Sequence, residues 1–209
     1  MKILKGLFIA VLALVVVFVV VGLLILPASM HVERSAIIEA SPAEVYPLIA
    51  SLERFNEWSP WADLDPAAVY EFTGPAAGVG ARMTWRSDKP EVGAGSQEVI
   101  AATENREVTV RLAFEGQGEA LAGWTLRPRG EGTLATWSFD MPLGMNPVMR
   151  WMGLMIDGPI GADYERGLAR LKNVAEQEAA EARAVEAAAQ AGAGDVEAAN
   201  GSTGQPPQQ

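Results

Sequence analysis

The hydrophobic pattern of the chain begins with one uninterrupted apolar run, from Leu7 to Leu26, whose twenty residues include no charge. At 1.5 Å per residue, such a helix is about 30 Å long, which matches the hydrocarbon core of a bilayer. We therefore predict a transmembrane anchor within residues 1–30. An uncleaved anchor is favoured over a secretory signal peptide, because the apolar region of a signal peptide is shorter, about 7–15 residues. The sequence that follows the run, LPASM at 26–30, is also a poor cleavage site.

The charges that flank this run predict its orientation. Lys2 and Lys5 precede it, whereas Arg34 is the one firm positive charge that follows it closely. Basic residues are retained on the cytoplasmic side of a membrane. The pattern therefore predicts a single-pass protein with a cytoplasmic N-terminus and an exported domain.

Beyond the anchor, residues 31–40 have the β-branched and apolar character of a strand. A helix is expected to follow, because Ser41 can cap it, Pro42 suits its first position and Glu44 stands three residues after the cap. Residues 54–61 predict a second short helix or turn, which Pro60 limits.

From Val69 to Met141 the pattern changes to short β-type runs separated by glycine-rich turns, which is typical of antiparallel hairpins. Alternation is clearest in 108–115, where Val108 and Val110 are apolar and Thr109 and Arg111 are polar. Such alternation predicts a sheet with one buried and one wet face. The predicted strands are 69–73, 80–87, 95–101, 107–115, 120–127 and 133–141.

A long helix is predicted to begin at Asn146-Pro147, because apolar residues from Met149 to Ala175 recur at steps of three and four. Gly158-Pro159 is expected to bend or briefly interrupt it. This helix is the only sizeable element left to cover the apolar face of the sheet. We divide the chain into the anchor, one domain at 31–176, and 177–209, an Ala/Glu-rich helix extension with a tail predicted to be disordered beyond Gly192.

Several sequence words in this order resemble the START-like, or birch-pollen-allergen-like, superfamily (SRPBCC), in its polyketide cyclase/dehydrase branch. They are RSAIIEASPAEVYPLI from Arg34, FNEWSPW from Phe55, GVGARMTW from Gly78, GAGSQEV from Gly93, WTLRPRGEGTLATWSF from Trp124 and DGPIGADYERGLARLKNVAE from Asp157. The resemblance covers residues 31–176. It implies an α+β helix-grip fold, in which a curved antiparallel sheet of about seven strands surrounds the long C-terminal helix. Function is less constrained, because members bind lipids, sterols, hormones or polyketides and only some are enzymes.

Composition removes several classes of chemistry. The chain has no cysteine and one histidine, which excludes disulfides, zinc sites and Cys/His nucleophile pairs. We therefore predict no metal and no other cofactor. The net charge is −10 and no basic stripe is present, so nucleic acid is not an expected partner.

The carboxylates do not form an evident catalytic group, and we predict no catalytic residue. Asp140 is expected to face water, because Thr136 and Ser138 share its strand phase. Asp157 and Asp163 lie on the long helix. If either faced a cavity, its pKa would rise and it could act as an acid.

The aromatic and methionine residues are the candidate lining of a cavity between the sheet and the long helix. Strand phase places Met83 with Trp85 and Trp137 with Phe139 on the helix-facing side. The predicted ligand-binding residues are Met83, Trp85, Phe114, Trp124, Trp137, Phe139, Met149, Met152, Ile156 and Tyr164.

The function that these patterns favour is a membrane-anchored module that binds an apolar small molecule or lipid. Two alternatives remain open at this point. One is a cyclase or dehydratase that acts on a polyketide-like substrate, with a cavity carboxylate or Tyr164 as acid or base. The other is a structural or interaction module whose cavity is filled by its own tryptophans.

Overall fold

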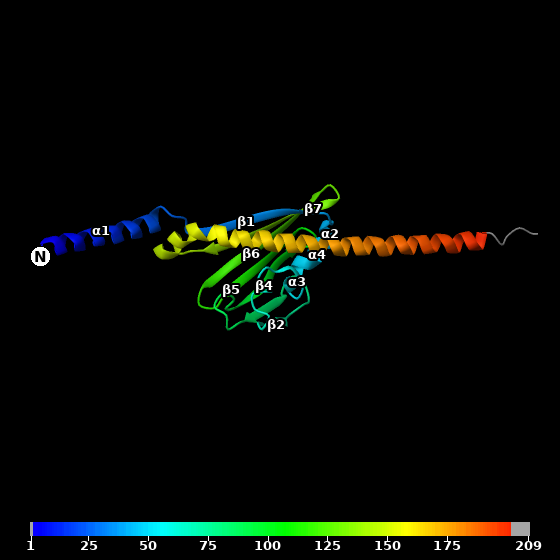
Figure 1. The fold of residues 1–209 in the computed structure, drawn as a ribbon, viewed down its shortest axis with the longest axis horizontal. Coiled ribbons are helices and arrows are strands. Elements are labelled where there is room, and N and C mark those ends of the chain that lie inside the picture. Colours follow the sequence, from blue (N-terminus) through cyan, green and yellow to red (C-terminus); the bar gives the residue numbers. More distant parts are fainter. Residues whose placement is uncertain (1, 202–209) are drawn as a thin grey trace, which may run out of the picture.

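The computed structural model describes the backbone of residues 2–201 and the side chains of residues 2–191. One long sheet, three helices and an N-terminal apolar helix make up this part of the chain (Figure 1). The helices are α1 (Lys2–Leu24), α2 (Pro42–Ala50), α3 (Phe55–Trp58) and α4 (Pro147–Gly201). The strands are β1 (Ser29–Ile38), β2 (Val69–Thr73), β3 (Arg82–Arg86), β4 (Ala94–Thr103), β5 (Glu107–Phe114), β6 (Gly118–Arg129) and β7 (Gly132–Pro142).

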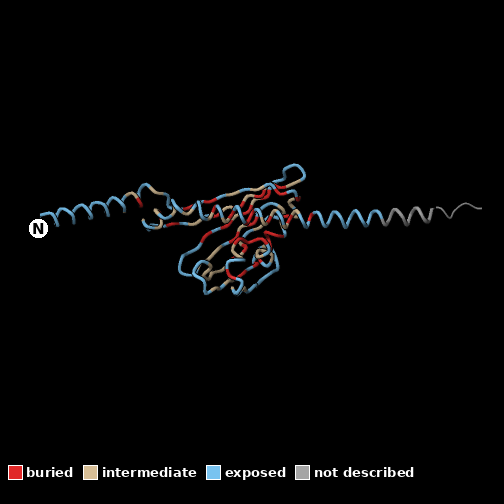
Figure 2. Tube along the Cα trace, viewed as in Figure 1, coloured by how far each residue is buried: buried red, intermediate tan, exposed pale blue. Residues whose placement is uncertain are grey.

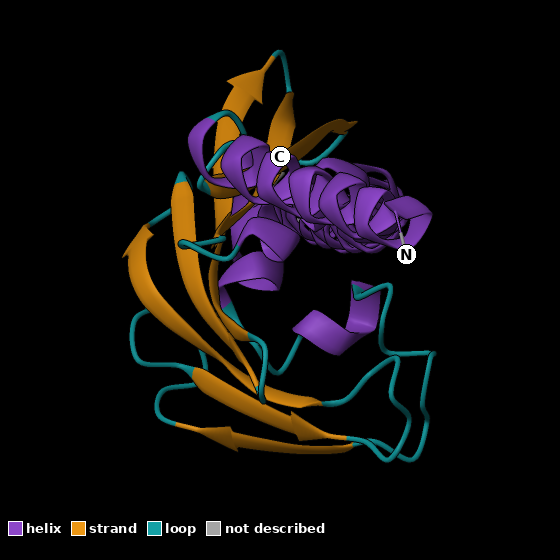
Figure 3. Ribbon diagram, turned by 90° about the vertical axis from the view of Figure 1, so that its left-hand side faces the viewer, coloured by secondary structure: helices purple, strands orange, loops and turns teal. Residues whose placement is uncertain are grey.

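The seven strands form one antiparallel sheet in the order β1-β7-β6-β5-β4-β3-β2. Every pair is a sequence neighbour except β1 and β7, so the first strand joins the last across the whole domain. The sheet curves around the helices, and α4 lies against its concave side (Figure 3). This architecture confirms the predicted α+β helix-grip fold with seven strands.

The core follows from alternation on the strands and from one stripe on α4. In β6, Ala120, Ala122, Trp124 and Leu126 are buried, whereas the residues between them are exposed or half-buried. The α4 stripe recurs at helical spacing and buries the apolar face of the sheet. Figure 2 shows this burial in the middle part of α4, with most of α1 and residues 180–191 of α4 exposed. The buried stripe residues are Tyr164, Leu168, Leu171, Ala175 and Ala179.

One expectation for the long helix is wrong. The helix is not interrupted at Gly158-Pro159, because α4 continues through both residues. Proline leaves the carbonyl of Met155 without its usual partner, but Met155 is 78% exposed, so this carbonyl lies on the outer side of the helix. The tail beyond Gly192 is predicted to be disordered, and the backbone of α4 is helical as far as Gly201. Residues 202–209 of the predicted tail lie outside the described residues.

The last turns of α1 lie directly beside the first turns of α4. Gly22 is the point of closest approach, since a Cβ there would stand 2.9 Å from the Cβ of Pro147. Phe18 stacks on Trp151 with ring centroids 5.3 Å apart, and the indole N–H of Trp151 donates to the carbonyl of Phe18 at 3.1 Å. By length and composition α1 is able to span a membrane, a property that signal sequences share.

Arg150 fixes this junction. Its side chain donates to the carbonyls of Leu23 at 2.7 Å and Leu26 at 3.3 Å, and to that of Gly144 at 2.9 Å. The carbonyls at a helix C-terminus have no partner within the helix and carry partial negative charge. The buried guanidinium of Arg150 therefore caps the end of α1 from the start of α4.

The start of α2 confirms the predicted cap. The backbone N–H of Ser41 donates to the carboxylate of Glu44 at 2.6 Å, and this hydrogen bond holds the pKa of Glu44 below its usual value. Because the folded-state pKa is depressed, the stabilisation is present above the unfolded pKa of about 4.3 and is lost as the pH falls through the folded value.

We therefore expect Glu44→Gln, which keeps an acceptor but removes the charge, to lower the free energy of unfolding at neutral pH by about 0.5 kcal/mol. The difference from the parent protein should vanish in acid, at a pH below the folded pKa. Denaturant titrations of both proteins at several pH values measure this. A difference that is independent of pH would show that the charge of Glu44 contributes nothing.

Candidate ligand-binding cavity

A cavity of about 320 Å³ lies between the concave side of the sheet, α3 and α4. The sheet supplies its lining from β2 to β7, and α4 supplies one short stretch. Apolar and aromatic side chains predominate, which is usual for small-molecule sites. The sheet and α4 lining includes Tyr70, Met83, Trp85, Gln97, Val110, Leu112, Phe114, Ala122, Trp124, Trp137, Phe139, Ile160, Asp163 and Tyr164.

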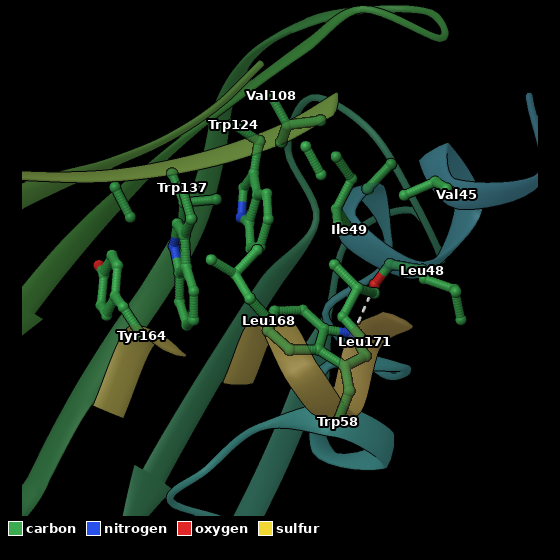
Figure 4. Packing of buried hydrophobic residues seen from close by; sticks show 14 of the residues in the cluster. Val45, Leu48, Ile49, Trp58, Val108, Trp124, Trp137, Tyr164, Leu168 and Leu171 are labelled. Carbon is green, nitrogen blue, oxygen red and sulfur yellow. Dashed lines mark hydrogen bonds between the residues drawn. The ribbon is translucent and has the colours of Figure 1, made fainter. Parts of the chain in front are cut away.

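Four aromatic side chains form the wall where the sheet meets α4 (Figure 4). Trp124 and Trp137, directly opposite each other on β6 and β7, stack with centroids 4.7 Å apart. Tyr164 of α4 stacks on the other face of this pair, 3.7 Å from Trp137. Trp58 meets both tryptophans edge-on at 5.5 and 5.4 Å. The wall is thus one aromatic cluster built from β6, β7, α3 and α4.

Gly167 allows Trp137 to approach α4 this closely. A Cβ at this position would stand 2.7 Å from the six-membered ring of Trp137 and 3.1 Å from Pro60. The first distance is too short for a real side chain and the second is unusually tight. The ring cannot move away easily, because it is stacked between Trp124 and Tyr164. The position of the aromatic wall therefore depends on a glycine one turn along α4 from Tyr164.

The indole N–H groups of Trp58 and Trp137 differ in whether they form a hydrogen bond. That of Trp58 donates to the carbonyl of Leu48 at 3.0 Å. That of Trp137 is buried and has no hydrogen-bond partner among the described residues. A buried unpaired donor costs about 1–3 kcal/mol. The apolar wall therefore contains one hydrogen-bond donor that no group among the described residues accepts from.

Other polar groups reach the cavity at its margins. Gln97 on β4 is 8% exposed and Asn56 on α3 also lines the space. The phenol of Tyr164 is buried, and this burial raises its pKa far above the usual value. Tyr164 therefore stays protonated at neutral pH, where it can donate a hydrogen bond but cannot act as a base.

Seven of the ten predicted ligand-binding residues come together around this cavity: Met83, Trp85, Phe114, Trp124, Trp137, Phe139 and Tyr164. The other three do not line it. Met149 and Ile156 are half-buried against the core, and Met152 is 48% exposed. These three lie nearer the start of α4, and the helix first lines the cavity at Ile160.

The sequence prediction missed the contribution of α3 and of two loops. Trp58, Trp61 and Leu52 line the cavity but were not among the predicted ligand-binding residues. Residues 90–93 of the β3–β4 loop also line the cavity. The segment FNEWSPW was the available signal, because three aromatic residues in a short polar turn are expected to pack against an apolar surface.

The carboxylates do not form a catalytic pair in the cavity. Asp163 lines it but forms an ion pair with Arg166 one turn away. Asp157 is outside the lining and pairs with Arg34 at 3.4 Å. Asp140 faces water as expected, 53% exposed and 2.7 Å from His31.

Two further observations bear on what the site can hold. Within the described residues, no group of three or more His, Asp or Glu side chains is arranged to hold a metal ion. A second hollow of about 520 Å³ lies over β2–β5, and its lining combines Trp85 and Phe114 with four charged side chains, those of Glu71, Arg82, Arg86 and Glu115. The cavity under α4 is therefore the candidate site for an apolar ligand.

Comparison with known proteins agrees with this geometry. The family model described as "Polyketide cyclase / dehydrase and lipid transport" matches residues 29–176. The chain belongs to this family. The match begins at β1 and ends within α4, so the family domain is the sheet with its helices, and α1 and the far part of α4 lie outside it.

Several solved structures share this fold although their sequences are at most 17% identical to that of the chain. A Staphylococcus aureus protein of unknown function, SA2116, has a TM-score of 0.54 at 10% identity, covering 72% of this chain and 95% of its own. MLL2253 from Mesorhizobium loti has a TM-score of 0.51 at 17% identity, with coverage of 70% and 97%. Ara h 8.0201 also has 0.51, at 12% identity and with coverage of 70% and 97%. No curated protein sequence matches the chain significantly.

The two indoles allow a matched test of the unpaired donor. Trp58→Phe leaves the buried carbonyl of Leu48 without its partner, whereas Trp137→Phe removes a donor that has none. Both substitutions remove the same atoms, so we expect Trp58→Phe to cost about 1–3 kcal/mol more in free energy of unfolding. Denaturant titration of the two variants measures the difference. Equal losses would mean that the N–H of Trp137 is satisfied in solution.

Proposed function

We propose that the protein is a membrane-anchored module that binds an apolar molecule in the cavity between the sheet, α3 and α4. The molecule would carry a hydrogen-bond acceptor that pairs with the indole N–H of Trp137. Burial of apolar surface, worth about 25 cal/mol per Å², would supply most of the affinity before the cost of association. The acceptor would fix the orientation of the ligand.

The observation that carries this proposal is the unpaired N–H of Trp137 in an otherwise apolar wall. A ligand acceptor would relieve the cost of that donor, which favours molecules with a carbonyl or ether oxygen over pure hydrocarbons. The N–H is fully enclosed, so a ligand reaches it only when neighbouring side chains move aside. The gain from pairing the donor would favour that movement.

The size of the cavity narrows the class of ligand. A volume of about 320 Å³ is near the lower end of the range for small-molecule sites, about 300–1,000 Å³. This favours a single-chain lipid or a small isoprenoid over a phospholipid with two chains. It also argues against the interaction-module alternative, in which the tryptophans of the domain would fill the cavity.

Binding is favoured over catalysis by the state of the polar groups. The carboxylate of Asp163 is paired with Arg166, and burial keeps Tyr164 protonated. Neither provides a base inside the cavity. The family description names lipid transport beside cyclase and dehydrase activities, and the first of these requires binding alone.

The membrane part of the proposal is supported by how α1 joins the domain. Arg150 caps the end of α1 and Trp151 packs on Phe18, contacts that a cleaved protein starting near Ser29 would lose. We infer that α1 is retained as an anchor. Lys2 and Lys5 before it would keep the N-terminus in the cytoplasm and place the domain on the exported side.

Ligand binding can be tested with a pair of probes that differ only in an acceptor, a medium-chain methyl ketone and the alkane of equal length. Each would compete with an environment-sensitive naphthalene dye for the detergent-solubilised protein. We expect the ketone to bind several-fold more tightly than the alkane. Trp137→Phe should remove this preference, because the donor is lost, and the alkane affinity of the same variant corrects for the smaller ring.

A second variant tests the location of the site. Ala122→Leu adds volume inside the cavity and should weaken binding of both probes. Ala101→Leu makes the same change on the exposed side of β4 and should leave binding unchanged. The proposed site is wrong if folded protein binds neither probe, or if both variants weaken binding equally.

Anchor retention and orientation have their own test. The intact mass of membrane-extracted protein should include residues 1–26, and reporters fused after Gln209 should be active only outside the cytoplasm. A mature N-terminus near Ser29 would contradict retention. A reporter active only in the cytoplasm would reverse the orientation.

A further inference from the structure

The start of α4 exposes an apolar surface that the binding function does not use. We call residues 143–156 the α4 arm; they comprise the end of the β7–α4 connection and the first ten residues of the helix. Apolar side chains at this density are unusual on a water-facing surface. The exposed side chains of the arm are Met145 (75%), Val148 (52%), Met152 (48%), Leu154 (57%) and Met155 (78%).

The only charge in the α4 arm is turned away from that surface. Arg150 is 6% exposed, and its guanidinium donates to the carbonyls at the end of α1 and to Gly144. In a bilayer, unpaired backbone carbonyls cost several kcal/mol each, because no water is present to hydrate them. These hydrogen bonds pair the guanidinium of Arg150 and, at the same time, satisfy carbonyls at the end of α1 that would otherwise be free.

The depth of the arm follows from its contacts with α1. Phe18, on which Trp151 stacks, lies six residues before Leu24, the last residue of α1, which is about 9 Å of helix. The apolar run from Leu7 to Leu26 is as long as the hydrocarbon core is thick, so its end coincides with the edge of that core. Trp151 consequently lies below the edge, beside lipid-facing residues of α1.

The apolar surface ends abruptly at Asp157. This carboxylate is 60% exposed and forms an ion pair with Arg34, which also pairs with Glu165 at 3.0 Å. The carbonyl of Met155, which Pro159 leaves without a helical partner, lies at the same level and can be hydrated there. The change from apolar to charged residues is what a helix shows where it leaves a membrane.

We propose that the α4 arm is a second membrane-embedded element, which lies against α1 and faces the acyl chains of the leaflet from which the domain emerges. The bilayer is the occupant of this surface because the arm is continuous with α1 and lies at its depth. The proposal rests on α1 being a membrane span. It goes beyond the anchor in holding the domain on the membrane through two elements instead of one tether.

The natural absence of cysteine makes the test direct. Single-cysteine variants Met152→Cys and Met155→Cys of the full chain would carry a bimane fluorophore in phosphatidylcholine vesicles that contain nitroxide-labelled acyl chains. Val16→Cys in α1 is the reference for lipid contact. Val185→Cys, 71% exposed on the same α4 helix beyond the domain, is the matched control for water contact.

We expect labels at 152 and 155 to be quenched by the nitroxide lipids nearly as strongly as the label at 16, and several-fold more than the label at 185. Quenching at 16 but not at 152 and 155 would overturn the α4 arm while the anchor stands. No quenching at 16 would overturn the anchor and the arm together. A third outcome is that the labels at 152 and 155 are shielded from both lipid and aqueous iodide, and that the cysteines cross-link between chains. This result would assign the surface to a second copy of the chain and would also overturn the proposal.

Discussion

The contact between Trp137 and Tyr164 determines how this domain is put together. A seven-stranded antiparallel sheet with one apolar face cannot be stable until that face is covered, and α4 is the element that covers it. The two rings meet in parallel at 3.7 Å, and the backbone of α4 lies along β1, the neighbour of β7 in the sheet. Beyond the contact the sheet curves away from the helix, and the space that opens under α3 becomes the cavity. The spacing of sheet and helix at one end thus creates the unfilled volume at the other.

Much of the fold could be predicted from the sequence because strand periodicity is a local property. Alternation along 108–114 and 120–126 specifies which side chains face the core, whatever the strands pair with. The predicted β2 segment, 69–73, matches the observed strand, and the others differ by a few residues at their ends. The resemblance to the family then supplied the helix-grip arrangement, whereas the pairing of the first strand with the last was not predicted, because it joins segments about 100 residues apart.

The candidate site was harder to predict on the helical side. The apolar stripe of α4 runs without a break from Met149 to Ala175, so its pattern does not indicate that the two ends contact different elements. In the structure, the part from Ile160 onward meets the sheet and cavity, whereas the earlier turns meet α1. Which partner a helical stripe contacts depends on where the helix crosses the sheet, and periodicity alone contains no such information. The lining from α3 and the β3–β4 loop was missed for a similar reason, since irregular segments have no period that reveals their orientation.

The continuity of α4 has a mechanical consequence. One helix of 55 residues, about 80 Å long, touches the end of α1, forms a wall of the cavity and then runs on past its last core contact at Ala179. A rigid helix of this length would pivot about the aromatic stack at Tyr164. A small tilt that makes room for a ligand would be a fraction of an ångström near the stack and several times larger at the distal end. Occupancy of the enclosed cavity would in this way be detectable as a displacement of the distal end of α4.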